Sequence, residues 1–514
     1  MPVKPATIWI STGTALIVAL GAALAFAAPA QAQLKVQPTE VPMSLRLGFE
    51  TIDLPHGERM GLVGGTLLLQ AAPGWWVGPA AYGAASGERG GLFVGGVELQ
   101  RRFVFGRTQL AAGLFAGGGG GAAAPVGGGL MLRPALTLMQ DFGGWQAGLS
   151  VSKLRFPSGD IDSNQFGLVV AWDGRFLHAD AADIGQAASA GWRSGVGFDC
   201  VVGTVGAYDL RFRDQPARRI GLIGTRLERR FGSGTGAANG FDAGALWGLE
   251  LAAAASGGAA GYMEILGSGG WDVAPLPRQA PSLRVGVRAA VGLGGGGGVP
   301  TGGGPIAKAS LGLSWQATSL LSTGVEVGVL KALDSRLRAP TAQWWLAVEI
   351  TPRGAPDGGV RGTTTEREVK LTEWAVALQH HSDVQRVDGS SRSLGTLGLK
   401  VNRYVSPNLY LSAQAHTAFA GGAGAYGIGL VGVGLTSAVP LRGWQAGVEA
   451  LLGASGGGGV DTSSGALAQA LLWAGWSPDA GSQWRVGIGG MRSFTGDLST
   501  PVLEAAYVWR FGQP

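Results

Sequence analysis

One glycine-rich pattern occurs three times in this sequence and limits the folds open to it. Each copy is a cluster of glycines, a short polar or apolar turn, at least one further glycine, and then apolar residues that alternate with other residues. The clusters begin at Gly117, Gly294 and Gly456. If Arg133, Lys308 and Gln469 are equivalent, the copies lie 308 − 133 = 175 and 469 − 308 = 161 residues apart. That spacing exceeds the roughly 20 to 50 residues of a solenoid repeat, so each copy must be a unit of several strands.

The first 32 residues have a different character. Lys4 precedes an apolar run from Trp9 to Ala27, and the small residues of 28–32 offer a cleavage site. A basic residue, an apolar run and small residues in this order indicate a secretory signal peptide. The sequence therefore predicts export and a mature chain that starts at Gln33, and an uncleaved membrane anchor is the alternative.

The rest of the chain is apolar without being helical. Only 14% of the residues are charged, whereas a soluble domain usually has about a quarter. No later window has the roughly 18 uninterrupted apolar residues of a transmembrane helix. Because a closed β-barrel is the other structure that satisfies its backbone within lipid, the sequence predicts a barrel in the bacterial outer membrane.

About 22 segments show the two-residue alternation of strands, and Pro73–Ala85 and Gly261–Pro275 could each hide another. Membrane strands of about 9 to 11 residues separated by turns have this spacing. We therefore predict an all-β protein, a large transmembrane antiparallel β-barrel of about 22 to 24 strands built from three internal repeats. Three consecutive eight-stranded barrels are the alternative. The expected divisions are a signal peptide (1–32), repeat 1 (33–172), a connector (173–190), repeat 2 (191–350), a connector (351–369) and repeat 3 (370–514).

The last segment places Tyr507, Trp509 and Phe511 on one face. In this respect the chain resembles Gram-negative outer-membrane β-barrel proteins, whose final strand ends in spaced aromatic residues. The resemblance implies recognition by the barrel-insertion machinery. The chain departs from the pattern because Gly512, Gln513 and Pro514 follow the last aromatic residue.

Four polar residues are candidates for lining the lumen. Arg133, Lys308 and Gln469 hold corresponding positions in the three repeats, and Arg403 lies near the end of another alternating segment. Polar residues flanked by lipid-facing ones should point inward, where they tune selectivity for solutes. The alternative is a structural charge paired with a nearby carboxylate.

His380 and Ser382 form a candidate catalytic pair. Alternation places both on one face of their segment, which is the lipid face of a barrel. The pair resembles the dyads of outer-membrane phospholipase A and lipid A deacylase, in which histidine deprotonates serine for attack on an acyl ester. The sequence departs from that pattern because the facing segment supplies no Asn or Glu to orient the histidine. The alternative is that His380 and His381 are polar residues at the membrane interface.

Asp160 and Asp162 could offer oxygens to Ca²⁺, but the ion prefers six to eight, and a turn stabilised by side-chain hydrogen bonds is the favoured interpretation. We expect no cofactor. The glycine clusters lack the Gly-Lys-Ser/Thr ending of a phosphate loop, and we interpret them as flexible extracellular loops. The few basic runs do not support nucleic-acid binding.

A barrel of 22 to 24 strands would enclose water unless plugged. The favoured function is therefore a passive conduit, or an export pore for solutes or a polymer, and not an enzyme. A lipid hydrolase that uses Ser382 and His380 is one alternative, and a structural or assembly barrel with a closed pore is another. Expected partners are outer-membrane lipid, lipopolysaccharide, the insertion machinery and a periplasmic protein docked on the connectors.

Overall fold

The computed structural model describes residues 35–189, 195–210, 217–231, 243–276, 279–280, 282–318, 320–350, 367–437 and 442–514. The predicted signal peptide and most of the predicted second connector lie outside these residues. Within them, no helix has the length and apolar character needed to cross a membrane.

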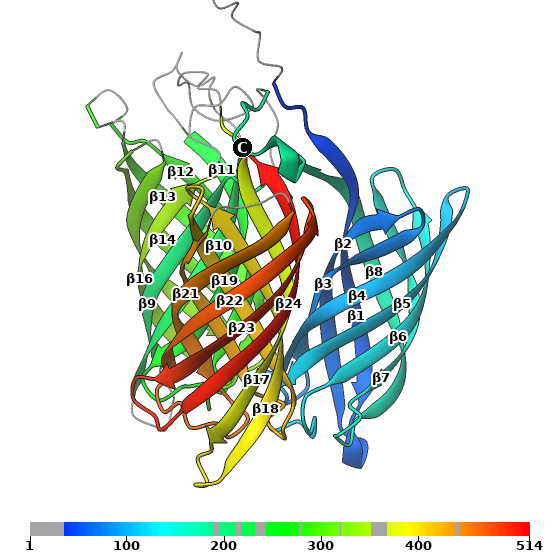
Figure 1. Ribbon diagram of the computed structural model, residues 1–514. Coiled ribbons are helices and arrows are strands. Elements are labelled where there is room, and N and C mark those ends of the chain that lie inside the picture. Colours follow the sequence, from blue (N-terminus) through cyan, green and yellow to red (C-terminus); the bar gives the residue numbers. More distant parts are fainter. Residues whose placement is uncertain are drawn as a thin grey trace, which may run out of the picture.

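The strands close into three separate barrels of eight strands each (Figure 1). Barrel 1 contains β1 (Thr39–Asp53), β2 (Arg59–Ala72), β3 (Trp75–Ser86), β4 (Phe93–Phe105), β5 (Thr108–Gly120), β6 (Met131–Asp141), β7 (Trp145–Arg155) and β8 (Asp162–His178). Barrel 2 contains β9 (Cys200–Leu210), β10 (Arg218–Phe231), β11 (Ala243–Ser256), β12 (Met263–Val273), β13 (Leu283–Gly295), β14 (Pro305–Gln316), β15 (Leu321–Ala332) and β16 (Arg338–Glu349). Barrel 3 contains β17 (Lys370–Gln385), β18 (Ser391–Tyr404), β19 (Leu409–Ala420), β20 (Gly427–Thr436), β21 (Gly443–Gly456), β22 (Ala466–Asp479), β23 (Ser482–Ser493) and β24 (Ser499–Gln513).

The all-β class, the threefold repeat and the upper strand count are confirmed, but the single large barrel is wrong. Each set of eight closes on itself through antiparallel pairing of its first and last strands. Leu45 pairs with Trp172, Val205 with Trp344, and Trp374 with Trp509. Every strand edge is therefore satisfied within its own barrel, and none is left to pair with the next.

Alternation along each strand separates the two surfaces. In β7, Leu149 and Val151 point outward and are 61% and 51% exposed, whereas Ser150 and Ser152 are buried inside. A strand of 11 residues such as β7, tilted by about 40°, spans roughly 28 Å, which matches the apolar band of a membrane barrel. The outward faces are thus suited to lipid and the inward faces to a polar interior.

The two ends of the barrels differ. The end that holds the C-terminus has two-residue turns at 73–74, 106–107 and 480–481 but also the longer connections 232–242 and 274–282, and the opposite end carries 121–130, 296–304 and 457–465. Exposed tryptophans gather on the strands near the first end. Among the described residues they include Trp75, Trp145, Trp172, Trp247, Trp271, Trp315, Trp444, Trp476 and Trp484. We call the first the terminal end and the second the loop end.

Each lumen is filled with apolar side chains near the loop end. A loop valine closes each barrel, and it packs into a cluster of buried residues from the strands. These valines are Val126, Val299 and Val460. The three follow equivalent glycine clusters, so the sequence repeat encodes a lid for each barrel. We call these clusters the apolar plugs.

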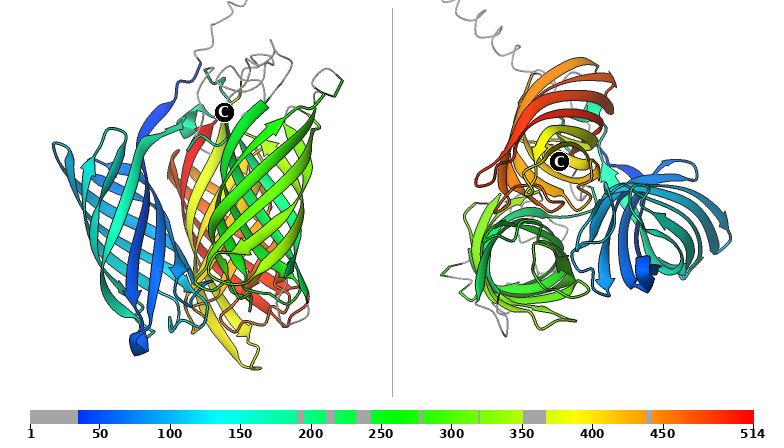
Figure 2. Two further views of the ribbon diagram at one scale, coloured as in Figure 1. Left: turned by 180° about the vertical axis from the view of Figure 1, so that it is seen from behind. Right: turned by 90° about the horizontal axis from the view of Figure 1, so that it is seen from below.

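The barrels pack around a pseudo-threefold axis at the loop end (Figure 2). At each junction the loop between the third and fourth strands of one barrel meets the loop between the fifth and sixth strands of the next. The Gly90 amide donates to the carbonyl of Gly302 (2.9 Å), and the Gly424 amide donates to that of Gly127 (3.1 Å). The third junction brings Gly261 against Gly456. The same contact repeated three times closes a ring.

These junctions require glycine because backbone touches backbone. A Cβ atom on Gly456 would lie 2.1 Å from the amide nitrogen of Gly261, and one on Gly129 would lie 2.4 Å from the carbonyl oxygen of Ala418. Such approaches are incompatible with any side chain. The glycine clusters are therefore packed contacts between barrels, which corrects their interpretation as flexible loops.

At the terminal end, barrels 1 and 3 are joined by aromatic side chains. Phe176 of β8 lies 5.1 Å from Trp374, 5.5 Å from Trp509 and 5.4 Å from Phe511, measured between ring centroids. The Ala179 and Gly512 backbones also exchange hydrogen bonds of 2.8 Å. The final aromatic residues of the chain are therefore partly buried against barrel 1.

The two suspected extra strands are present as β3 and β12. The first connector begins after His178 rather than at Asp173, because β8 continues beyond the barrel wall to pair with the start of β1. It includes the short helix η2 (Ala181–Asp183) and pairs with the residues that lead into β17, where the Val369 amide donates to Gln186 (2.9 Å).

Candidate functional site

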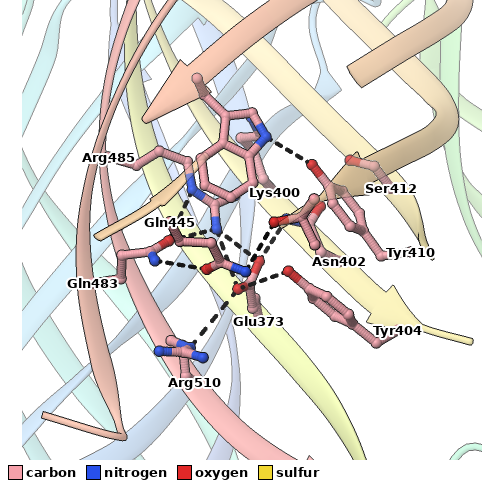
Figure 3. A network of polar contacts seen from close by, with 12 residues as sticks. Glu373, Lys400, Asn402, Tyr404, Tyr410, Ser412, Gln445, Gln483, Arg485 and Arg510 are labelled. Atoms are coloured by element: carbon pink, nitrogen blue, oxygen red, sulfur yellow. Dashed lines mark hydrogen bonds and ion pairs between the residues drawn. The ribbon is translucent and has the colours of Figure 1, made fainter. Parts of the chain in front are cut away.

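The lumen of barrel 3 holds a polar network centred on Glu373 of β17 (Figure 3). Arg485 of β23 approaches this carboxylate to 3.0 Å, and Asn402 of β18 donates to it at 2.9 Å. Arg510 lies 3.9 Å away, and the Tyr404 hydroxyl donates at 3.4 Å. The four partners come from β18, β23 and β24, so the carboxylate links four neighbouring strands of the barrel.

A second ionic cluster lies beside it. Lys400 of β18 contacts Glu449 at 3.1 Å and Glu504 at 2.8 Å, and all three side chains are buried. Glu449 also accepts a hydrogen bond from Tyr410 (2.9 Å), whose hydroxyl oxygen accepts one from the Trp473 indole (2.9 Å). Bulky side chains fit in so narrow a lumen because glycines face them: a Cβ atom on Gly434 would lie 2.0 Å from the Tyr410 ring.

Barrel 1 has an equivalent arrangement. Arg133 of β6 makes a bidentate contact with Glu50 of β1, at 2.8 and 2.7 Å, and Ser152 donates to the same carboxylate at 2.9 Å. Glu98 of β4 accepts from the Tyr82 hydroxyl at 3.3 Å. A bidentate arginine and carboxylate pair is both strong and geometrically specific.

Barrel 2 contains the densest network. Arg226 contacts Glu326 at 2.9 Å, and Arg288 contacts Glu228 at 2.6 Å. Lys308 contacts Glu250 at 2.6 Å. Further contacts join these pairs: Arg226 lies 3.3 Å from Glu228, and Arg288 lies 3.7 Å from Glu326. The charges form a continuous belt around the wall.

The buried charges of barrel 3 balance, and little space remains beside the ion pairs of barrels 1 and 2. The strands of barrel 3 bury three cations and three carboxylates, namely Lys400, Arg485, Arg510, Glu373, Glu449 and Glu504. The cavity beside Arg133 and Glu50 has a volume of 40 Å³, and that beside Lys308 and Glu250 has 10 Å³. A water molecule needs about 10 to 15 Å³ on this measure, so these spaces hold a few waters at most.

Three of the four predicted lumen residues point inward. Arg133 and Lys308 are ion-paired as described, while Gln469 is buried in barrel 3 and its side-chain amide has no protein partner in the described part of the chain. Arg403 does not line the lumen. Asn402 and Tyr404 on either side of it point inward, so Arg403 points outward and donates to the carbonyl of Gln513 (3.0 Å) at the barrel rim.

The predicted dyad lies at the loop end of β17. His380 is exposed on the outer face, as alternation predicts, and Ser382 is half-buried. Among the described residues no hydrogen bond joins the two. The strand pairing is broken between His381 and Val384, and Asp383 has a φ of 52°. The Ser382 carbonyl accepts a hydrogen bond from Thr500. This irregular backbone does not align the serine with the histidine.

The Asp160 and Asp162 pair does not form a cation site. Asp162 contacts Lys153 at 2.9 Å and Arg155 at 3.7 Å, and the Asp160 amide donates to the carbonyl of Pro125 (2.9 Å). No group of three or more His, Cys, Asp or Glu side chains suited to a metal exists in the described ranges.

One ion pair ties the loops of barrel 1 together outside the lumen. Arg89 makes a bidentate contact with Glu58 and donates to the carbonyl of Ala122 (3.0 Å). The hydrogen bonds from Arg89 lower the pKa of the Glu58 carboxyl below its ordinary value of 4.5.

No protein-family model matches the chain, and no curated protein matches it significantly. Solved structures that align with it include the outer membrane protein OpdK of Pseudomonas aeruginosa (9% identity, TM-score 0.21, 92% of this chain and 98% of that chain). The FrpB iron transporter of Neisseria meningitidis also aligns, with 10% identity and a TM-score of 0.26 over 94% of this chain and 83% of that chain. The siderophore receptor PirA of P. aeruginosa aligns with 8% identity and a TM-score of 0.26 over 92% of this chain and 81% of that chain. At such TM-scores the overall arrangements differ, so the function of this chain must be argued from its own geometry.

The sequence analysis did not predict that a set of carboxylates completes the lumen networks. Glu50, Glu250, Glu373, Glu449 and Glu504 each interrupt an alternating segment at an inward position. A charge at an inward position in each of several neighbouring segments was the available signal, since a narrow lumen can bury a charge only beside its opposite.

Proposed function

We propose that this protein resides in the bacterial outer membrane and that its three barrels act there as one closed unit. The outward surfaces support this location. Leu149, Leu311 and Ile488 are 60 to 61% exposed, and soluble monomers rarely expose large contiguous apolar surfaces. The tryptophans near the terminal end fit an interfacial girdle, and the two-residue turns there support a periplasmic position for that end.

The main support for closed barrels is that side chains fill each lumen. An apolar plug occupies the loop end, and a belt of ion pairs crosses the middle. A hydrated ion would have to displace the plug and separate buried ion pairs. Breaking one such pair costs about 3 to 5 kcal/mol. We therefore favour closed barrels over a wide conduit, because a wide conduit requires one large barrel.

Planar-bilayer recording of the purified, folded protein tests this proposal. We expect no conductance steps from the wild-type chain. Regular steps from protein whose fold is verified by β-type circular dichroism would overturn the closed state. A heat-modifiability gel on the same sample shows whether the barrels remain folded.

A gated transport role is the second candidate, because loop residues rather than strand residues close each plug. If the plugs are movable gates, substituting Asp for Val126, Val299 and Val460 should hydrate them and produce conductance. If the ion-pair belts close the lumens independently, as we propose, the triple variant should stay silent. The two candidates are thereby separated in one recording.

The expected protein partners follow from the ends of the chain. We propose that the insertion machinery recognises the outward side chains of Tyr507, Trp509 and Phe511 on β24, and that a periplasmic protein docks on the connectors. Replacing all three aromatic residues with Ala should reduce assembly in cells, as measured by the folded fraction in isolated outer membranes. Unchanged assembly would contradict recognition through these residues.

A further inference from the structure

We propose that the outer wall of barrel 3 binds the lipid A part of lipopolysaccharide, a phosphorylated glycolipid with several acyl chains. The wall carries a groove of 950 Å³ over β20 to β24, towards the loop end. Its lining includes Val431, Leu452, Ala470, Gly490 and Arg492. This volume is at the upper end of the range for ligand sites.

The groove of barrel 3 contains Gly490, an outward position at which both neighbouring barrels have a larger residue. Strand pairing makes Gly490 equivalent to Val329 of barrel 2, since Gly490 pairs with Pro501 and Val329 with Pro340. The equivalent residue of barrel 1 is Lys153. Gly490 is thus specific to one repeat, whereas the alanines of the floor, Ala450 and Ala470, have the counterparts Ala289 and Ala309 in barrel 2.

Small residues also form the neighbouring floor. Ala450 and Ala470 line the groove on β21 and β22, whereas Leu114 of barrel 1, which is equivalent to Ala450, is 49% exposed and projects from the wall. Val431 and Leu452 border this floor with branched side chains. A floor without projecting side chains beside apolar walls suits flexible acyl chains.

A cation marks the loop end of the groove. Arg492 is exposed near the end of β23, and no carboxylate of the described residues pairs with it. Its equivalent in barrel 1, Arg155, contacts Asp162 at 3.7 Å, but Ser499 takes the facing position beside Arg492. An unpaired guanidinium above an apolar groove complements a phosphate above acyl chains.

The choice of lipid rests on the proposed location. With the terminal end in the periplasm, the loop end faces the outside, and the groove lies in the outer leaflet. The outer-leaflet lipid of this membrane carries phosphates and several acyl chains, which match Arg492 and the large groove. A phospholipid in the same groove is the competing occupant.

Native mass spectrometry of the purified full-length protein in detergent tests the proposal. The probes are hexa-acylated lipid A with two phosphates, the same lipid without phosphate, and phosphatidylethanolamine. We expect the wild-type chain to retain lipid A most, and to retain the dephosphorylated form up to about fivefold less, as for loss of one exposed ion pair. Equal retention of lipid A and phosphatidylethanolamine would overturn the choice of lipid A.

Two variants locate the site. Gly490→Leu should fill the groove and abolish retention, and it is sterically tolerated because a Cβ atom there meets only the Thr500 carbonyl oxygen, at 3.7 Å. Arg492→Gln should remove only the preference for phosphate. The matched controls in barrel 2, Val329→Leu and Lys331→Gln, should bind as the wild type does.

Retention by Gly490→Leu equal to that of Val329→Leu would overturn the groove as the site. A phosphate preference that survives in Arg492→Gln would overturn the role of the cation. Because binding is measured on purified protein, it does not depend on where cells place the chain. Membrane fractionation tests the proposed location separately, so the two can fail independently.

Discussion

Substitution of Gly456 by Ala tests the packing between barrels most sharply. Gly456 lies near the end of β21 and needs no left-handed backbone, so the added methyl group acts only through space. Its Cβ atom would lie 2.1 Å from the Gly261 nitrogen and 2.5 Å from the Ala260 carbonyl carbon. To restore an ordinary contact of 3.4 Å, barrels 2 and 3 must separate by about 1.3 Å at this junction.

Overpacking of this kind costs about 1 to 3 kcal/mol, which corresponds to roughly 5- to 150-fold in an association constant. To measure it, a protease site is inserted into the connector between β16 and β17 and cleaved in detergent. Size-exclusion chromatography then reports the fraction of barrel 3 that stays with barrels 1 and 2. The contacts with barrel 1 are unchanged, so the difference reports this junction.

Gly429→Ala is the matched control, since a Cβ atom at Gly429 has no neighbour within 4 Å and the residue belongs to the same barrel. We expect this control to dissociate as the wild type does, and Gly456→Ala to dissociate more readily. Equal dissociation of the two variants would refute the argument that glycine is required for contact between the barrels.

Three further predictions concern single sites. Lys400→Met leaves two buried carboxylates without their cation, so the free energy of unfolding in detergent and urea should fall by about 3 to 5 kcal/mol; an unchanged midpoint would contradict the network. Phospholipid ester hydrolysis by the wild-type protein should equal that of Ser382→Ala, and activity lost in the variant would restore the dyad. Because the pKa of Glu58 is lowered by Arg89, its stabilisation is present above pH 4.5 and is lost as the pH falls below that value. The protection of residues 87–92 against hydrogen exchange, measured relative to the intrinsic rate at each pH, should therefore fall in acid, but not in Glu58→Gln, where protection is already low.

Strand positions could be predicted because each strand separates lipid from lumen. Leu149, Ser150 and Val151 show this directly: alternation in sequence becomes alternation in burial. The C-terminal strand and the equivalence of Arg133, Lys308 and Gln469 followed from the same pattern. Such reasoning fixes which residues face inward, but it does not fix which strand closes which barrel.

Closure could not be predicted from alternation, because strands of one large barrel and of three small ones have the same pattern. The difference lies in pairing between distant strands, as between Leu45 and Trp172. The glycines also have roles that alternation does not reveal. Gly434 makes room for Tyr410 inside a narrow lumen, and Gly456 lets two barrels touch.

The arrangement of the barrels in projection tests the central claim most directly. Electron microscopy of the detergent-solubilised protein, viewed along the barrel axes, should show three small, filled densities at the corners of a triangle. A single ring around a central water-filled pore would contradict the account.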